Sequence, residues 1–304
     1  MRSHGRRGSA RTGWTGLAMA AALGVTVVAC DTADDVDGEA GEGPEMDGAA
    51  EAYDRATDLV RSARQDEAID VALEAIERYP EDAELRKRLG YALRYAGMFD
   101  ESVDSYQRAI SLDDTLPRRV SDEGQIAKSL IYKGAYEEAL EVQTGLYDYL
   151  DELGEEPDEK MLFYEGVIHV YRADTARAIE LFDAAEAADP ESVWTEFGRA
   201  YRDALTGDVE SLRERARALR DRDVADGERH YRLAQFHALA GEPDEAVERL
   251  EVSLDGGFFA YPYVAEDPLL GEEIQEHPGF RDILERMRER HEGVAESVAA
   301  AAGR

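Results

Sequence analysis

The feature that most constrains this chain is a helical hairpin that recurs along its length. Its clearest copy runs from Ala83 to Asp114 and reads as two helices joined by a tight turn at Gly97. Apolar side chains recur every three or four residues in both helices, so each helix has one face to bury. A lone hairpin cannot bury both faces, and the pattern repeats at a period of about 34 residues. The sequence therefore predicts a stack of helical hairpins.

Two glycines in this copy have distinct expected roles. Gly90 stands inside the first helix, where the missing side chain lets a second helix approach closely. Gly97 suits the left-handed residue that ends a helix.

The hairpin resembles the tetratricopeptide repeat (TPR), whose first helix carries Leu-Gly and Tyr and whose second carries small, aromatic and small residues before a Pro. The matching positions are Leu89, Gly90, Leu93, Ser102, Tyr106 and Ala109. Arg86 replaces the opening aromatic residue and Asp114 the closing Pro. The resemblance implies an all-α, right-handed solenoid of about six TPR-like hairpins over residues 49–255. We expect a short insertion around Leu116–Arg119 and a looser repeat at Ser211–Arg220; another type of helical-hairpin solenoid is the alternative.

The first 29 residues predict a lipoprotein signal peptide. Residues 1–14 carry four Arg and no acid, and Leu17–Ala29 is apolar but too short to span a bilayer. Val27 to Cys30 resembles a bacterial lipobox, which implies that Cys30 is lipidated, and Cys30 is the chain's single cysteine. The alternatives are a plain signal peptide with an incidental cysteine, or a buried thiol.

This anchor implies a place in the cell membrane or the outer membrane, facing the periplasm or the exterior. Asp31 resembles the signal that retains enteric lipoproteins in the inner membrane, a rule that varies between bacteria. Residues 30–48 are acidic and Gly-rich, and we expect a disordered tether there.

The charge and the motifs narrow the classes of function. The formal charge is −33, and loss of residues 1–29 makes it about −37, so phosphates would be repelled and nucleic acid is not an expected partner. A partial calcium-loop spacing around Asp35 lacks its first ligand at Ala33 and its bidentate acid at Pro44. The sequence contains no phosphate loop, nucleophile elbow or zinc-protease helix. We therefore predict no catalytic residue, no metal site and no cofactor.

The segment after the array predicts a C-terminal cap over residues 256–291. Gly256–Tyr263 reads GGFFAYPY, and apolar residues at helical spacing follow from Ile283. The last repeat has an apolar face that such a segment can cover. A ligand pocket formed by Phe258, Phe259 and Tyr261 is the alternative. Residues 292–304 are Ala-rich, and we expect them to fray.

In the TPR family the first helix of each repeat lines a concave groove. Those positions, carried over one repeat at a time, are Tyr53, Arg61, Lys87, Tyr91, Arg94, Tyr95, Lys128, Tyr132, Lys160, Phe163, Tyr171, Arg199, Arg202 and Tyr231. They include most of the chain's scarce Lys, and Lys and Arg with Tyr suit an extended acidic segment of a protein partner. The alternative is that these cations neutralise acids of neighbouring repeats.

Together these features predict a lipid-anchored, extracytoplasmic scaffold for protein–protein interactions and not an enzyme. The carboxylate clamp of chaperone-binding TPR domains needs paired Asn, and this chain has no Asn. One alternative is a structural subunit of a cell-envelope or secretion assembly, which would use the convex face or Gly256–Tyr263. Another is a small-molecule carrier or sensor with a pocket around Phe163 and Tyr171; a third is an enzyme of unrecognised type.

Overall fold

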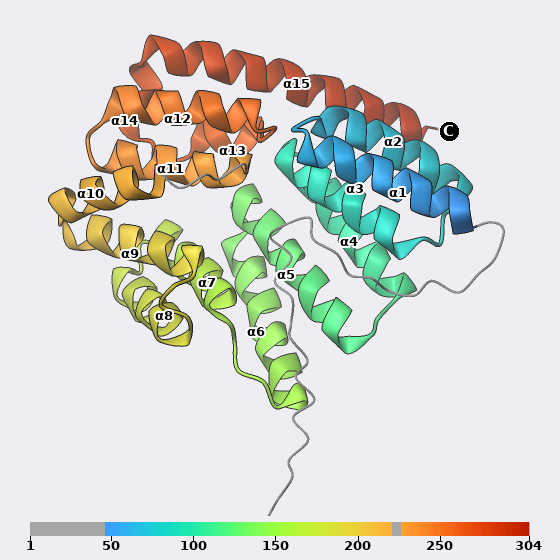
Figure 1. Ribbon diagram of the computed structural model, residues 1–304, viewed down its shortest axis with the longest axis horizontal. Helices are drawn as coiled ribbons and strands as arrows, with labels where there is room; N and C mark the ends of the chain where they lie inside the picture. Colours follow the sequence, from blue (N-terminus) through green and yellow to red (C-terminus); the bar gives the residue numbers. More distant parts are fainter. Residues whose placement is uncertain (1–45, 221–225, 304) are drawn as a thin grey trace, which may run out of the picture.

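The computed structural model describes residues 46–220 and 226–303, so the predicted signal peptide, Cys30 and nearly all of the tether lie outside it. Within these ranges every regular element is one of fifteen helices, which confirms the all-α class (Figure 1). The first twelve form consecutive hairpins: α1 (Met46–Arg61) with α2 (Gln65–Arg78), α3 (Ala83–Tyr95) with α4 (Phe99–Leu112), α5 (Leu116–Lys133) with α6 (Tyr136–Leu153), α7 (Glu159–Tyr171) with α8 (Thr175–Ala188), α9 (Val193–Thr206) with α10 (Val209–Arg220), and α11 (Gly227–Leu239) with α12 (Pro243–Asp255). None of these described helices is both long and apolar enough to cross a membrane.

The second hairpin shows how the repeat packs. A Cβ on Gly90 would lie 2.7 Å from Cε2 of Tyr106, so the tyrosine ring of α4 sits directly against the backbone of α3. The Ser102 hydroxyl donates a hydrogen bond of 2.7 Å to the Gly90 carbonyl. Gly97 ends the first helix with a φ of 80°, in the left-handed region. Both glycines therefore have the roles that the sequence predicts.

Acidic N-caps fix where several first helices begin. The Asp82 carboxylate accepts from the Leu85 amide at 2.8 Å, and the Asp158 carboxylate accepts from the Met161 amide at 2.8 Å. Asp226 caps α11 in the same way through the Glu228 amide, also at 2.8 Å. Each cap satisfies an amide that the helix itself leaves without an acceptor.

The third hairpin is longer than the others. Its helices α5 and α6 have 18 residues each, and α6 extends beyond the rest of the array (Figure 1). The residues of the expected insertion, Leu116–Arg119, form the first turn of α5, which is longer than α3 and α7 with 13 residues each, and Pro117 is in a position that helices tolerate.

Three further helices follow the array: α13 (Tyr261–Glu266), α14 (Gly271–Glu276) and α15 (Pro278–Ala302). Helices α14 and α15 pack against α12, the outer helix of the last hairpin. The expectation of a frayed tail from residue 292 is wrong, because α15 continues to Ala302. Val294 is only 3% exposed and belongs to the main core, which holds this last part of the helix in place.

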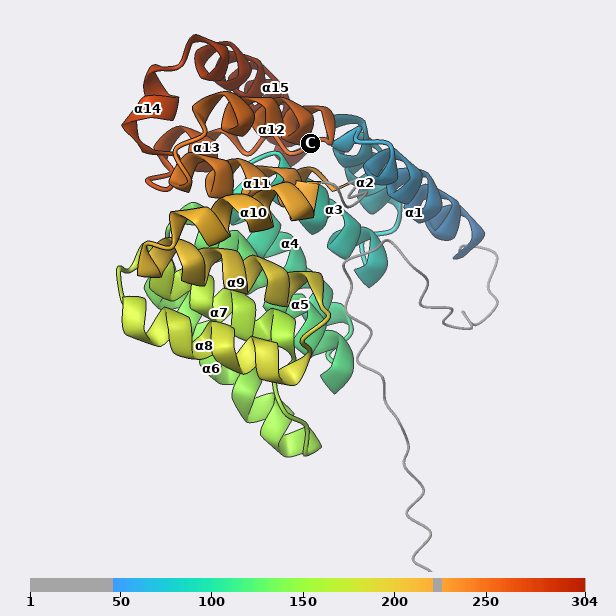
Figure 2. The same ribbon diagram turned by 60° about the vertical axis from the view of Figure 1, so that its left-hand side comes forward.

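Helix α15 also joins the two ends of the array. It packs against α2 of the first hairpin as well as against α12 of the last (Figures 1 and 2). An Arg290 Nη lies 3.2 Å from an Asp66 carboxylate oxygen, and Nδ1 of His291 lies 2.7 Å from the Ala96 carbonyl oxygen. The solenoid is therefore closed on itself along this side.

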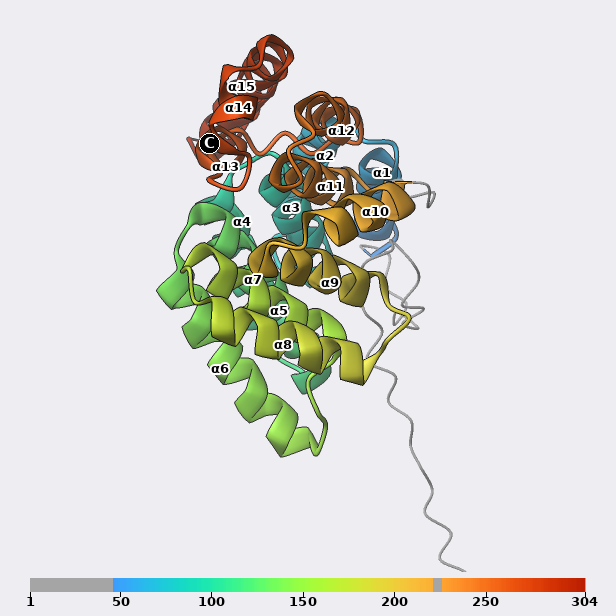
Figure 3. The ribbon, with the colours of Figure 1, turned by 90° about the vertical axis from the view of Figure 1, so that its left-hand side faces the viewer.

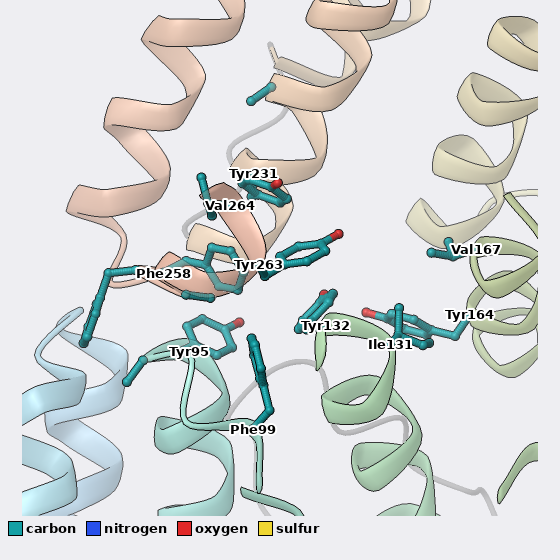
Figure 4. Packing of buried hydrophobic residues seen from close by; sticks show 14 of the residues in the cluster. Tyr95, Phe99, Ile131, Tyr132, Tyr164, Val167, Tyr231, Phe258, Tyr263 and Val264 are labelled. Carbon is teal, nitrogen blue, oxygen red and sulfur yellow. The ribbon is translucent and has the colours of Figure 1, made fainter. Parts of the chain in front are cut away.

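Residues 256–267, the segment between α12 and α14, fill the inside of the closed array. Phe258 is fully buried, and its ring contacts Tyr95 and Tyr231 at centroid distances of 5.4 Å and 5.3 Å. The Tyr263 ring stacks on Tyr132 at 4.6 Å (Figure 4). The amide of Phe259 donates to the Tyr95 carbonyl at 2.9 Å. This segment therefore packs side chains of three different hairpins into one core.

Candidate functional site: a cation–aromatic strip

The structure corrects the prediction of an open groove. Of the predicted lining residues, those that are buried are Arg94, Tyr95, Lys128, Tyr132, Lys160, Phe163 and Tyr231. Those that are half-buried are Tyr53, Lys87, Tyr91, Tyr171, Arg199 and Arg202, and Arg61 is exposed. The physical reason is closure, because α11 and residues 256–267 occupy the space that an open solenoid would leave to a partner.

One edge of the interior is closed by hydrogen bonds around Asp267. Its carboxylate accepts from Tyr231 at 2.5 Å and from Gln235 at 2.6 Å, and Tyr171 donates to it at 3.2 Å. Burial raises the pKa of Asp267, although these donors oppose the shift. Around Tyr171, where the alternative function would place a small-molecule pocket, side chains fill the space, and the Tyr171 hydroxyl lies 2.5 Å from that of Tyr263. Phe163, on the same helix, is fully buried among aromatic rings.

The centre of the interior holds a buried carboxylate, Glu228. Tyr164 donates to it at 2.8 Å, Tyr132 also donates to it, and an Arg94 Nη lies 3.6 Å away. Burial disfavours its charge, but Lys128, Arg94 and Arg232 outweigh burial and lower the pKa of Glu228. Glu228 therefore stays ionised and holds cations of several repeats together.

Cations and aromatic rings of the first helices form what we call the cation–aromatic strip: Tyr53, Arg88, Tyr91, Arg94, Lys128, Lys160, Trp194 and Arg229. These residues come from α1, α3, α5, α7, α9 and α11, and α9 packs against both α7 and α11 (Figure 3). The strip thus runs across all six hairpins.

Trp194 is the aromatic centre of the strip. The Nζ atoms of Lys128 and Lys160 lie 5.5 Å and 5.6 Å from its ring centroid, and the guanidinium carbon of Arg229 lies at 5.5 Å. Lys128 also lies 4.4 Å from the ring of Tyr164. Such distances are within the range of cation–π attraction.

The far end of the strip is built on α1 and α3. Arg88 donates to the Tyr53 hydroxyl at 2.9 Å, and its guanidinium lies 5.1 Å from that ring. Arg94 lies 5.3 Å from the Tyr91 ring. Tyr53, Arg88, Tyr91 and Arg229 are half-buried, so they are the members with surface to offer.

The sequence interpretation missed three members of the strip. Trp194 marks a repeat position but was not expected to line a groove, and Arg88 and Arg229 lie beside predicted lining positions. Positive charge near predicted lining residues was the available signal. Arg88 precedes Tyr91 in one first helix, and Arg229 precedes Tyr231 in another.

Other predicted groove cations form ion pairs within the array. Lys87 lies 3.5 Å from Asp122, Arg199 lies 3.0 Å from Glu186, and Arg202 lies 2.6 Å from Asp183. For these the alternative interpretation, neutralisation of acids on neighbouring helices, describes what the structure shows.

Asp122, the partner of Lys87, gives a prediction on pH. Burial raises the pKa of Asp122 to about 7 from its ordinary 3.8, although Lys87 opposes the shift. The folded state therefore keeps a proton that the unfolded chain releases, and stability falls as the pH rises from about 4 to about 7.

Asp122→Asn removes this titration. We expect the variant to gain about 2 kcal/mol of unfolding free energy relative to wild type between about pH 5 and about pH 7.5. Urea unfolding at both pH values measures the difference, with Asp282→Asn at an exposed position as the control. A difference between variant and wild type that is the same at both pH values would contradict the assignment.

No group of metal-ligating side chains occurs among residues 46–220 and 226–303. The two histidines of α11, His230 and His237, differ in their surroundings. His237 is buried with Nδ1 2.9 Å from a Glu242 oxygen, while His230 is half-buried.

The chain is similar in fold to solved structures of other proteins. No protein-family model and no curated protein matches the chain. Among solved structures, a Rap protein complexed with Competence and Sporulation Factor aligns with a TM-score of 0.61 and 16% identity, over 84% of this chain and 78% of that one. A tetratricopeptide repeat protein from Parabacteroides merdae aligns at 0.43 with 17% identity, over 84% and 93%. YrrB, described as a TPR protein with an unusual peptide-binding site, aligns at 0.35 with 16% identity, over 61% and 91%.

Fold and neighbours together define the class, an α-solenoid built of helical hairpins. In fold the hairpins are TPR-like, as the repeat pattern predicts, and the likeness to the Rap structure, at 16% identity, is one of fold alone.

Proposed function

We propose that this chain is a scaffold for protein–protein interactions that binds an acidic segment of a partner at the cation–aromatic strip, without catalysis. The observation that carries the proposal is that Arg88 and Arg229 are half-buried beside the rings of Tyr53 and Trp194, so the strip presents cations and aromatic surface at its accessible members. The strip thus gathers five cations, Arg88, Arg94, Lys128, Lys160 and Arg229, in a chain with a formal charge of −33.

Electrostatics favour an acidic partner at this one place. Carboxylates of the partner would gain charge-assisted hydrogen bonds from Arg88 and Arg229, and the rings of Tyr53 and Tyr91 would supply rigid contact area. The acidic surface elsewhere would repel the same segment and so restrict it to the strip. The Rap protein, solved with a bound factor, is a precedent for a partner on this fold.

The strip gives a direct binding prediction. We expect short peptides rich in Asp and Glu to bind wild type, and Arg88→Glu with Arg229→Glu to weaken that binding by about tenfold or more, since two attractions become repulsions. Fluorescence polarisation at two salt concentrations measures it, and binding should weaken as salt rises.

The matched control is Arg172→Glu with Arg281→Glu, which changes the charge equally at exposed positions away from the strip. Equal loss in both double variants would show that only net charge matters. Affinity that does not respond to salt would also count against the proposal.

We further propose that the scaffold is held at a membrane outside the cytoplasm by a lipid on Cys30. The lipobox-like run from Val27 to Cys30 supports it. An anchored scaffold keeps its partner near the membrane at raised effective concentration.

The anchor predicts the location of a Cys30 variant. Cys30→Ala should move the protein from the membrane fraction and abolish incorporation of a labelled fatty acid, with folding unchanged. Fractionation and labelling in a bacterial host test this. Labelling that persists in the variant would overturn the assignment of Cys30.

A further inference from the structure

A cleft of about 430 Å³ lies over α5 between α4 and α6, on a different face of α5 from Lys128. Its floor is apolar and consists of Val103, Ile126, Leu130 and Val142. Ile126 and Leu130 are buried in the core, while Val103 and Val142 are half-buried. The cleft therefore offers apolar surface over a firm base.

The rim of the cleft is acidic. Glu123, Glu138 and Glu141 line it, and Glu138 and Glu141 are exposed. Burial raises the pKa of Glu123, so its half-buried carboxylate gains from a nearby cation. One cation already lies there, because the Arg119 guanidinium is 4.6 Å from the Tyr149 ring and 3.7 Å from Glu123.

Gly145 in the middle of α6 also lines the cleft. A Cβ built on it would meet nothing within 4 Å, so the fold does not require a glycine at this position. Glycine inside a helix is less favourable than Ala. A bare patch of helix backbone facing a cleft allows another backbone to approach closely.

We propose that this cleft binds an amphipathic helix of a protein partner that presents apolar side chains flanked by Lys or Arg. The apolar side chains fill the floor, the cations meet the glutamates of the rim, and the partner backbone crosses α6 at Gly145. This is the helix-in-groove mode of recognition, with charge complementarity that selects a cationic helix. The site is separate from the cation–aromatic strip. It takes a cationic partner, whereas the strip takes an acidic one.

The test uses a labelled synthetic helical peptide with Leu on one face and Lys beside it. We expect Gly145→Leu, which fills the cleft, to weaken binding by about tenfold or more. Gly124→Leu is the matched control, because Gly124 also lies inside a helix with open space around it and does not line the cleft. Circular dichroism and thermal unfolding check that both variants are folded.

A second pair of variants separates this site from general attraction to an acidic protein. Glu138→Gln with Glu141→Gln should weaken binding, whereas Glu272→Gln with Glu273→Gln, exposed on α14, should not. Equal effects in the two pairs would overturn the proposal. Equal binding of a peptide with Gln in place of Lys would also overturn it, since the occupant would then be an apolar ligand. A photoreactive Leu analogue in the peptide should crosslink wild type at α4, α5 or α6, and crosslinks elsewhere contradict the site.

Discussion

Replacing Glu228 by Gln is expected to lower the free energy of unfolding by about 3–5 kcal/mol, because the change leaves buried cations without their counter-charge. Glu228 is only 5% exposed and lies among Arg94, Lys128 and Arg232. Gln keeps the size of the side chain, so the loss reports charge and not volume. Urea unfolding near neutral pH measures it.

Two controls make this result specific. Glu272→Gln at an exposed site should change stability by no more than about 0.5 kcal/mol. Adding Lys128→Met to the Glu228 variant removes one uncompensated cation, so part of the lost stability should return. If the Glu228 variant were as stable as wild type, the cluster would not hold the interior together.

Replacing Phe258 by Ala is expected to lower the free energy of unfolding by about 3–5 kcal/mol, the range for a large buried ring. The ring is fully buried and contacts Tyr95, Tyr132 and Tyr231, which come from three different hairpins. Its loss therefore leaves a cavity where distant repeats meet.

The Phe258 variant has a regional signature as well. Amide hydrogen exchange should rise in α3 and α11 together, since the segment joins them, rather than in α12 alone. Leu153→Ala, at a position 37% exposed, is the control and should have little effect. Exchange that rises only next to residue 258 would show that the segment is a local cap.

The repeat pattern was enough to predict the hairpins. Gly90 and Gly97 fix a close helix crossing and a turn through local rules, and such rules can be read from one sequence. The aromatic run at Gly256–Tyr263 was expected to cover the apolar face of the last repeat, whereas Phe258 lies inside the array and contacts rings of three hairpins.

The closure of the array could not be predicted in this way. It depends on contacts such as Arg290 with Asp66, which are far apart in sequence and follow no period. For the same reason Tyr132 and Tyr231 were expected in a groove, because a position on a first helix is the same in an open and in a closed solenoid. Burial then depends on what fills the inside, and that is set by the number of repeats and by residues 256–267.

The closed array is the central claim, and a distance between its two ends tests it most directly. Spin labels at Asp66→Cys and Arg290→Cys, in a chain with Cys30→Ser, report that distance by electron paramagnetic resonance. The structure, with the Arg290 guanidinium 3.2 Å from the Asp66 carboxylate, predicts one short and narrow distribution. A reference pair at Asp66 and Glu152, at the tip of α6, should give a long distance (Figure 1). A long or broad distribution for the first pair in a fully helical protein would show an open solenoid and contradict the account.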